Sequence, residues 1–192
     1  MKINTGDIIL CSGNGKLSQR IKWFNRVCRA KGQAAEITHV AEVHDEHSIF
    51  ESTTLNYYND KSGVQINEFG EWLKNYDGKV WIRRRNFYSR GNFCSGSATE
   101  WIKRKQLQLV GTPYEHGIPG AIELLLCIPR WNLFNKTGYI HCSQGVAMVD
   151  RYASLTIYGI NTSNMPPFTF WDDGDYEDWL VFNELLPAEE LK

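Results

Sequence analysis

The sequence has no long hydrophobic run and no excess of charge of one sign. Lys and Arg total 21 against 22 Asp and Glu, so no overall field favours nucleic acid or another highly charged partner. The most apolar window, residues 118–128, is interrupted by Pro119 and Glu123 and is too short to span a bilayer. The segment Met1–Asp7 lacks the apolar stretch of a secretory signal. We therefore expect no nucleic-acid partner and no integral membrane segment.

The cysteines lack any pairing pattern. They stand at positions 11, 28, 94, 127 and 142, an odd set without close pairs, which is typical of free thiols in a reducing compartment. We therefore expect a cytoplasmic protein. Cys11, Cys28 and Cys127 fall in apolar runs, where small core residues are expected. Cys142 alone has a context that indicates chemistry.

Several common functional motifs are also missing. The chain contains no GxSxG, no P-loop and no GxGxxG. His39, His44 and His47 could be zinc ligands, but their spacing lacks the CxxC or HExxH form. The acidic segment 172–175 has a calcium-like composition without the EF-hand spacing or its closing glutamate. We expect neither a metal nor another cofactor.

The sequence does contain enough apolar and aromatic residues for a folded core, at 42% and 13% of 192 residues. This length and composition predict one α+β domain over residues 1–192. Strands are predicted at residues 7–11, 37–43, 48–52, 64–66, 80–83 and 179–182. Helices or helical turns are predicted at 17–29, 69–73, 99–109, 119–127 and from 139 onward. In the first helix, we expect Phe24 and Val27 to face the core and Lys22 to face solvent.

Three of these segments carry the parts of a nucleophilic site. His39 lies in the strand at 37–43, Glu51 in the strand at 48–52, and Cys142 near the start of the last helix. A thiol, an imidazole and a carboxylate form a nucleophile, its base and the orienter of that base. A helix N-terminus and a neighbouring imidazolium both stabilise a thiolate. Taken singly, the cysteine or the histidine could equally be a structural residue.

The turn between the two strands decides whether His39 and Glu51 meet. A two-residue loop at 45–46 would set His39 opposite Ser52 and on the other face from Glu51. A three-residue loop at 44–46 would set His39 directly opposite Glu51. Because the turn contains no glycine, the two-residue type I′ turn is disfavoured. We predict the odd loop and hence the pair.

The order of these segments resembles the circularly permuted papain-like hydrolases of the NlpC superfamily, particularly the YiiX/YebB-like group, whose distant relatives include lecithin retinol acyltransferase. In that group the histidine strand precedes the cysteine helix, as it does here. The matching segments are Gly6–Ile9, Thr38–Val43, Ile49–Ser52, Gly63–Ile66, Gly111–Tyr114 and Ile140–Val146. Gln144 departs from the group, which more often has an acidic residue there, and this bears on the polarity of the pocket.

The resemblance implies Cys142 as the nucleophile, His39 as the base and Glu51 as the orienter, with Tyr114 lining the site. It also implies a permuted papain-like fold, with an antiparallel sheet or partly closed barrel packed against helices and the nucleophile at a helix N-terminus. The implied activity is that of a cysteine peptidase or amidase, which cleaves an amide bond in a peptide or cell-wall peptide through a thioacyl intermediate.

Two other functions stay open. The acyltransferase relatives imply an acyl or lipid ester as an alternative substrate. Such an enzyme needs a wide apolar mouth, which tryptophans could supply, although ordinary core and loop positions are the favoured explanation for them. The tryptophans concerned are Trp23, Trp81, Trp101 and Trp131. A non-catalytic ligand-binding module that kept the shell is the third possibility, and a Cys142 far from His39 would favour it. The oligomeric state is not fixed by the sequence.

Overall fold

The computed structural model describes residues 2–27, 30–54, 62–85, 95–114, 140–153, 170–171 and 185–192. These residues form an α+β structure, in which a six-stranded sheet is flanked by four α-helices. The strands are β1 (Ile8–Gly13), β2 (His39–Val43), β3 (Ser48–Thr53), β4 (Gly63–Glu68), β5 (Gly78–Arg83) and β6 (Glu189–Glu190). The helices are α1 (Lys16–Val27), the 3-10 helix η1 (Gly32–Glu36), α2 (Phe69–Asn75), α3 (Ser95–Leu109) and α5 (Cys142–Tyr152).

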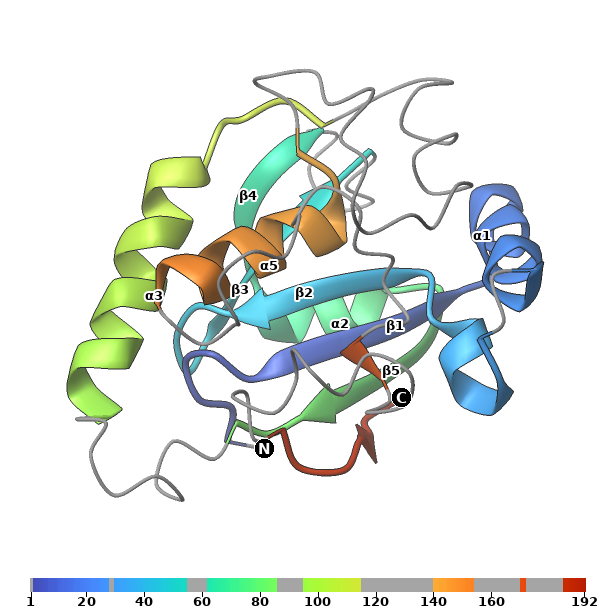
Figure 1. Cartoon of the computed structure of the whole chain (residues 1–192), viewed down its shortest axis with the longest axis horizontal. Coiled ribbons are helices and arrows are strands. Elements are labelled where there is room, and N and C mark those ends of the chain that lie inside the picture. The colour runs from blue at the N-terminus through green and yellow to red at the C-terminus, as the bar shows by residue number, and fades with distance from the viewer. Residues whose placement is uncertain are drawn as a thin grey trace.

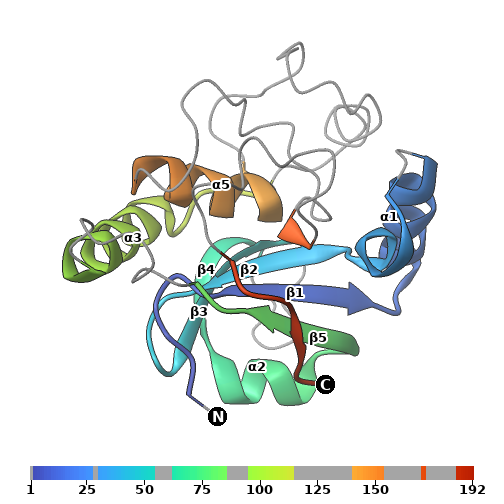
Figure 2. The ribbon, with the colours of Figure 1, turned by 60° about the horizontal axis from the view of Figure 1, so that its bottom comes forward.

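The sheet has the strand order β4-β3-β2-β1-β5-β6, and all its neighbouring strands run antiparallel. Because side chains alternate along a strand, the sheet has two apolar faces. Leu10 and Val40 pack with α5, whereas Cys11 and Ala41 pack with α2. Figures 1 and 2 show α5 and α3 on one side of the sheet and α2 on the other. The sheet therefore lies between two helical layers.

The turn between β2 and β3 has an odd number of residues, as predicted. The backbone N–H of His44 donates to the carbonyl oxygen of Ser48 at 2.9 Å, so residues 45–47 form the loop. The carboxylate of Asp45 accepts from the His47 backbone N–H at 2.9 Å and from the Ser48 hydroxyl at 2.7 Å. The side chain of Asp45 thus stabilises the three-residue turn by accepting hydrogen bonds from residues within it. A turn held in this way does not need the glycine that a two-residue hairpin loop requires.

The register of this hairpin differs from the prediction by two residues. Val43 lies opposite Ile49, whereas a loop at 44–46 would have set it opposite His47. A shift of two residues keeps every side chain on its face. His39 and Glu51 are consequently diagonal neighbours on one face, and the prediction that they stand directly opposite each other is wrong.

Helix α1 is oriented differently from the prediction. Phe24 is buried as expected, but Lys22 and Asn25 are buried as well. Val27, predicted to face the core, is 58% exposed. The predicted orientation assumed that apolar residues alone choose the buried face, whereas α1 attaches to the body of the protein through polar groups.

Other boundaries follow local chemistry. Helix α3 ends shortly before Gly111, whose φ of 86° is the left-handed conformation that favours glycine after a helix. Strand β6 was not predicted, because two adjacent glutamates carry no apolar alternation. None of the described helices has the length and apolarity that crossing a bilayer requires. The residues outside the described part of the chain include Cys28, Cys127, the segment 172–175, and the predicted helix 119–127 and strand 179–182.

Candidate active site

His39 and Glu51 form a short, largely buried polar pair. The Nε2 atom of His39 lies 2.7 Å from Oε2 of Glu51. The side chains are 16% and 4% exposed, so little water competes for this contact. Because Nε2 is committed to the carboxylate, Nδ1 is the ring nitrogen that remains to face a third group.

The carboxylate of Glu51 is held from its other side by two further donors. Its Oε1 atom accepts from Nδ2 of Asn67 at 2.7 Å and from the indole N–H of Trp72 at 3.1 Å. Asn67 reaches it because Gln65, two residues earlier on β4, is the direct cross-strand partner of Glu51. Neither Asn67 nor Trp72 was predicted from the sequence. The available signal was that a buried indole N–H normally finds an acceptor.

Cys142 is the first residue of α5, and the residue before it caps the helix. The Nδ1 atom of His141 accepts from the Gln144 backbone N–H at 3.3 Å, and Oε1 of Gln144 accepts from the His141 backbone N–H at 3.4 Å. This reciprocal arrangement is a capping box. Gln144 stands where the resembling group more often has an acidic residue. Here it is the third residue of the helix, and its side chain completes the capping box. His141 itself was not predicted to have a role.

The electrostatic environment favours a thiolate at Cys142. Burial alone would raise the pKa of this thiol, but hydrogen bonds from His141 and His39 and the charge of His39 outweigh it and lower the pKa to about 5. Burial would likewise lower the pKa of His39, but the hydrogen bonds and charges of Cys142 and Glu51 raise it to about 10. Both shifts favour the ion pair of a thiolate and an imidazolium over the neutral pair.

Tyr114 lies beside the segment that leads into α5. It forms a parallel β-bridge with Ile140, and the Ile140 backbone N–H donates to the carbonyl of Pro113 at 3.1 Å. The hydroxyl of Ser52, the neighbour of Glu51, donates to the Ile140 carbonyl at 2.6 Å. The strand that carries the carboxylate and the loop that carries Tyr114 thus both fix the backbone two residues before Cys142.

His44 and His47 do not join this group. Nδ1 of His44 lies 2.7 Å from Oε1 of Gln106, and the side chain of His47 is 80% exposed beside Glu46. Each of the three histidines considered above as zinc ligands therefore has a separate partner. The three-histidine zinc interpretation does not fit this arrangement.

Comparison with known proteins adds information on the fold. No protein-family model matches the chain, and no curated protein matches its sequence. Among solved structures, the chain is similar to the metalloprotein YiiX from Escherichia coli O157:H7, with a TM-score of 0.55 and 14% sequence identity, covering 100% of this chain and 98% of that chain. YiiX belongs to the group that the sequence resembles, so the resemblance is supported at the level of the fold.

Because YiiX is described as a metalloprotein, we tested the site residues as metal ligands. In the described part of the chain, no three His, Cys, Asp or Glu side chains are placed to hold a metal ion. Both oxygens of Glu51 are already hydrogen-bonded, and Nε2 of His39 is one of their partners. Nδ1 of His141 is occupied by the helix cap. These donor atoms therefore do not fit a metal site.

Proposed function

We propose that the chain is a thiol hydrolase, a single permuted papain-like domain over residues 1–192, with Cys142 as nucleophile, His39 as acid and base, and Glu51 as orienter. The observation that carries the proposal is the connected set of Glu51, His39 and Cys142, with the thiol at the first residue of a helix. A thiol with a pKa near 5 is ionised at neutral pH and needs no separate activation step.

The chemistry follows from these charges. The thiolate sulfur attacks the substrate carbonyl carbon, and the carbonyl electrons move to its oxygen. When they return, the bond to the leaving group breaks, and the departing nitrogen takes a proton from the His39 imidazolium. Neutral His39 then removes a proton from water as that water attacks the thioacyl carbon. Release of the acid product restores the thiolate and the imidazolium.

The N-terminus of α5 can stabilise the negative oxygen of the tetrahedral intermediates. The backbone N–H of Cys142 lies in the first turn, where no intrahelical carbonyl is available to accept it. The helix dipole places partial positive charge at the same end. A donor already oriented in a water-poor site stabilises developing charge at little reorganisation cost.

A polar pocket is formed by described residues, but Cys142, His39 and Glu51 do not line it, so the preference for a peptide over an acyl substrate rests on the family resemblance. A pocket of about 520 Å³ lies among β1, α1, η1 and β5, and Lys22, Glu36 and Lys79 supply its charges. Among the described residues that line it, Trp81 is the one large apolar side chain, and Trp81 packs in the same cluster as Cys142. Trp23 and Trp101 lie on α1 and α3, at opposite ends of the molecule (Figure 1), so they do not form a common apolar mouth.

The test is turnover of fluorogenic peptide amides, including cell-wall peptides, alongside short and long acyl esters. We expect amide cleavage by the wild type and by Cys11→Ala, a control that removes a different buried thiol, and none by Cys142→Ala. Cleavage of esters alone would favour the acyl hydrolase or acyltransferase alternative. Full activity of a folded Cys142→Ala variant would contradict the mechanism, and a folded wild type inert on every substrate would favour the binding module.

A further inference from the structure

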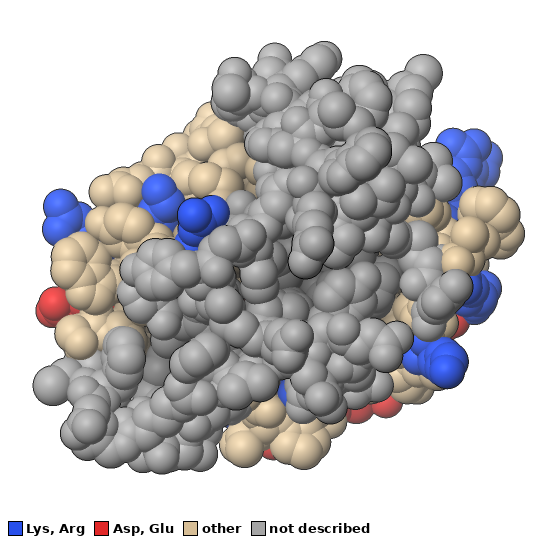
Figure 3. Space-filling view, in the orientation of Figure 1, with Lys and Arg blue, Asp and Glu red and all other residues tan. Residues whose placement is uncertain are grey.

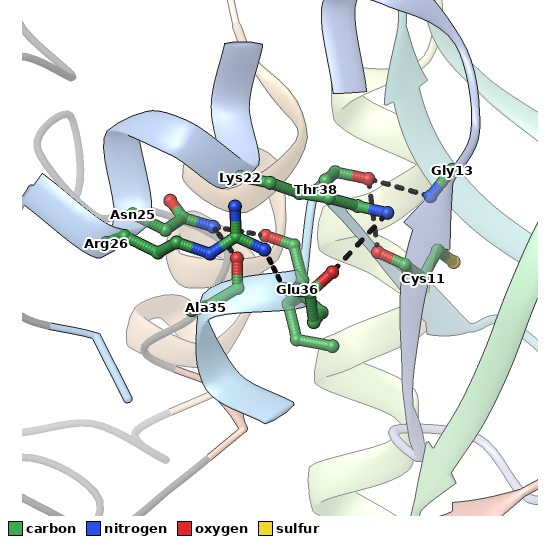
Figure 4. A network of polar contacts seen from close by, with 9 residues as sticks. Cys11, Gly13, Lys22, Asn25, Arg26, Ala35, Glu36 and Thr38 are labelled. Carbon is green, nitrogen blue, oxygen red and sulfur yellow. Dashed lines mark hydrogen bonds and ion pairs between the residues drawn. The ribbon is translucent and has the colours of Figure 1, made fainter. Parts of the chain in front are cut away.

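Helix α1 buries a polar face. Asn25 is fully buried, and its Nδ2 atom donates to the carbonyl oxygens of Ala35 at 3.2 Å and Ile37 at 2.7 Å. Figure 4 shows this amide directed from α1 toward the η1 segment. A side-chain amide therefore fixes the helix to the body of the protein, at a position where a globular helix ordinarily presents an apolar residue.

Charged groups reinforce the same attachment. The Lys22 side chain is only 8% exposed, and its Nζ lies 3.6 Å from Oε2 of Glu36. The guanidinium of Arg26 contacts the other carboxylate oxygen of Glu36 at 2.5 Å. One carboxylate of η1 thus receives two cations of α1 (Figure 4), and the rotation of the helix about its axis is set by polar contacts.

The consequence is that large apolar side chains of α1 face solvent. Leu17 is 55% exposed, Trp23 is 62% exposed and Val27 is 58% exposed. Trp23 and Val27 are four residues apart and so lie on one side of the helix. By contrast Trp101, the exposed tryptophan of α3, is covered in part by ring contacts with Tyr152 and Arg104.

The exposed side of α1 is also cationic. The helix contains no acidic residue, and Lys16 and Arg20 are both exposed. Arg20 lies three residues before Trp23, so the cation and the indole share one surface. Figures 1 and 2 place α1 at one end of the molecule, and Figure 3 shows Lys and Arg atoms at that end as well as at the α3 end. Apolar and cationic groups thus occur together on a projecting helix.

We propose that α1 docks on an anionic phospholipid surface, with Trp23 and Val27 at the level of the headgroups and Lys16 and Arg20 against their phosphates. Charge complementarity favours this occupant, because the surface has exposed cations and no acid of its own on the helix. Tryptophan has an intrinsic preference for the membrane interface, and a fluid surface requires no matching groove. A helix of about three turns gives weak and reversible binding. The inference does not depend on the proposed catalysis.

The test is sedimentation of the full chain with vesicles made of equal parts phosphatidylglycerol and phosphatidylcholine, and with vesicles of phosphatidylcholine alone. We expect binding to the anionic vesicles that weakens as salt is added. Arg20→Gln should reduce the partition coefficient about fivefold, because a basic residue near an anionic surface contributes about 1 kcal/mol. Trp23→Ser should reduce it as well, and Trp101→Ser is the matched control on α3.

Each outcome decides the proposal. Loss of binding in Trp23→Ser with retention in Trp101→Ser would support it, provided that circular dichroism shows both variants folded. Absence of wild-type binding to anionic vesicles would overturn it, as would equal losses in the two tryptophan variants. A wild type that elutes as a dimer, and that Trp23→Ser converts to a monomer, would show instead that this face pairs with a second copy of the chain.

Discussion

The imidazole of His39 interacts with both Glu51 and Cys142, and this defines its chemistry. Nε2 contacts the buried carboxylate of Glu51, which leaves Nδ1 for Cys142. The carboxylate stabilises the charged ring and fixes its orientation, and the charged ring in turn stabilises the thiolate. The two groups therefore titrate together, and a change at Glu51 should be felt at Cys142.

Replacing Glu51 by Gln tests this coupling. Loss of the carboxylate charge removes a stabiliser of the imidazolium, so the pKa of His39 should fall from about 10. A neutral His39 stabilises the thiolate less, so the pKa of Cys142 should rise from about 5. We expect turnover at neutral pH to drop about a hundredfold or more. The pH–rate profile is the measurement, and an unchanged acid limb would contradict the coupling.

His141 combines two roles that mutation can separate. Its Nδ1 atom caps α5, and its side chain contributes to lowering the pKa of Cys142. Asn is a good capping residue without an imidazole, so His141→Asn should keep the stability and raise the pKa of Cys142. His141→Ala should also lose about 1 kcal/mol of stability. Thermal unfolding and alkylation rates measured on both variants distinguish the roles, and identical behaviour of the two would argue against this division.

At the scale of elements, a buried ionic group joins the histidine strand to the cysteine helix. Arg85 places Nη2 at 2.8 Å from Oδ1 of Asp150 on α5 and at 3.6 Å from Oε1 of Glu42 on β2. The amide of Gln106, on α3, donates to the other oxygen of Glu42 at 2.9 Å. Burial raises the pKa of both carboxyl groups. These contacts hold α5 against β2 behind the site.

Arg85→Met should therefore be strongly destabilising. It leaves two buried carboxyl groups without their cation, and breaking a buried ion pair on one side costs about 3–5 kcal/mol. The matched control is Arg26→Met, because Arg26 pairs with Glu36 but is 57% exposed. An exposed pair of that kind contributes at most about 1 kcal/mol. Urea unfolding measures both changes, and equal losses would contradict the importance of the buried group.

The elements near the site were predictable from the sequence because their apolar residues alternate or recur at helical spacing. Helix α5 shows this, since a helix was predicted from residue 139 onward and the structure has one over Cys142–Tyr152. The register between β2 and β3 was not predictable, because the side chain of Asp45 selects the turn. The orientation of α1 was missed for a similar reason, since Asn25 makes its decisive bonds with backbone carbonyls.

At the scale of the whole molecule, the sheet is shared by residues from both ends of the chain. Strand β1 pairs with β5, and β5 pairs with β6 near the other end of the chain. Arg83 of β5 also donates to the carbonyl oxygens of Phe170 and Leu186. If the chain is a single domain, it should unfold in one transition that tryptophan fluorescence and far-UV circular dichroism report at the same urea concentration. Two separated transitions would contradict the single domain.

Long-range contacts are also where prediction from the sequence reached its limit. Cys142 and His39 are far apart along the chain, and periodicity places each on its own element without stating that the two meet. The resemblance of the ordered segments to a known group supplied the connection between the two residues. From local sequence patterns alone, a structural role for Cys142 was at least as acceptable as a catalytic one. Trp72 and Asn67, which hold Glu51, lie on yet other elements, and no local pattern specifies them.

The most direct test of the account is the pH dependence of iodoacetamide alkylation at Cys142, located by mass spectrometry, in the wild type and in His39→Ala. The account predicts an apparent pKa of about 5 in the wild type, moving toward the free-thiol value of about 8.5 in the variant. A wild-type Cys142 that reacts no faster than the buried Cys11 and is unaffected by loss of His39 would contradict it.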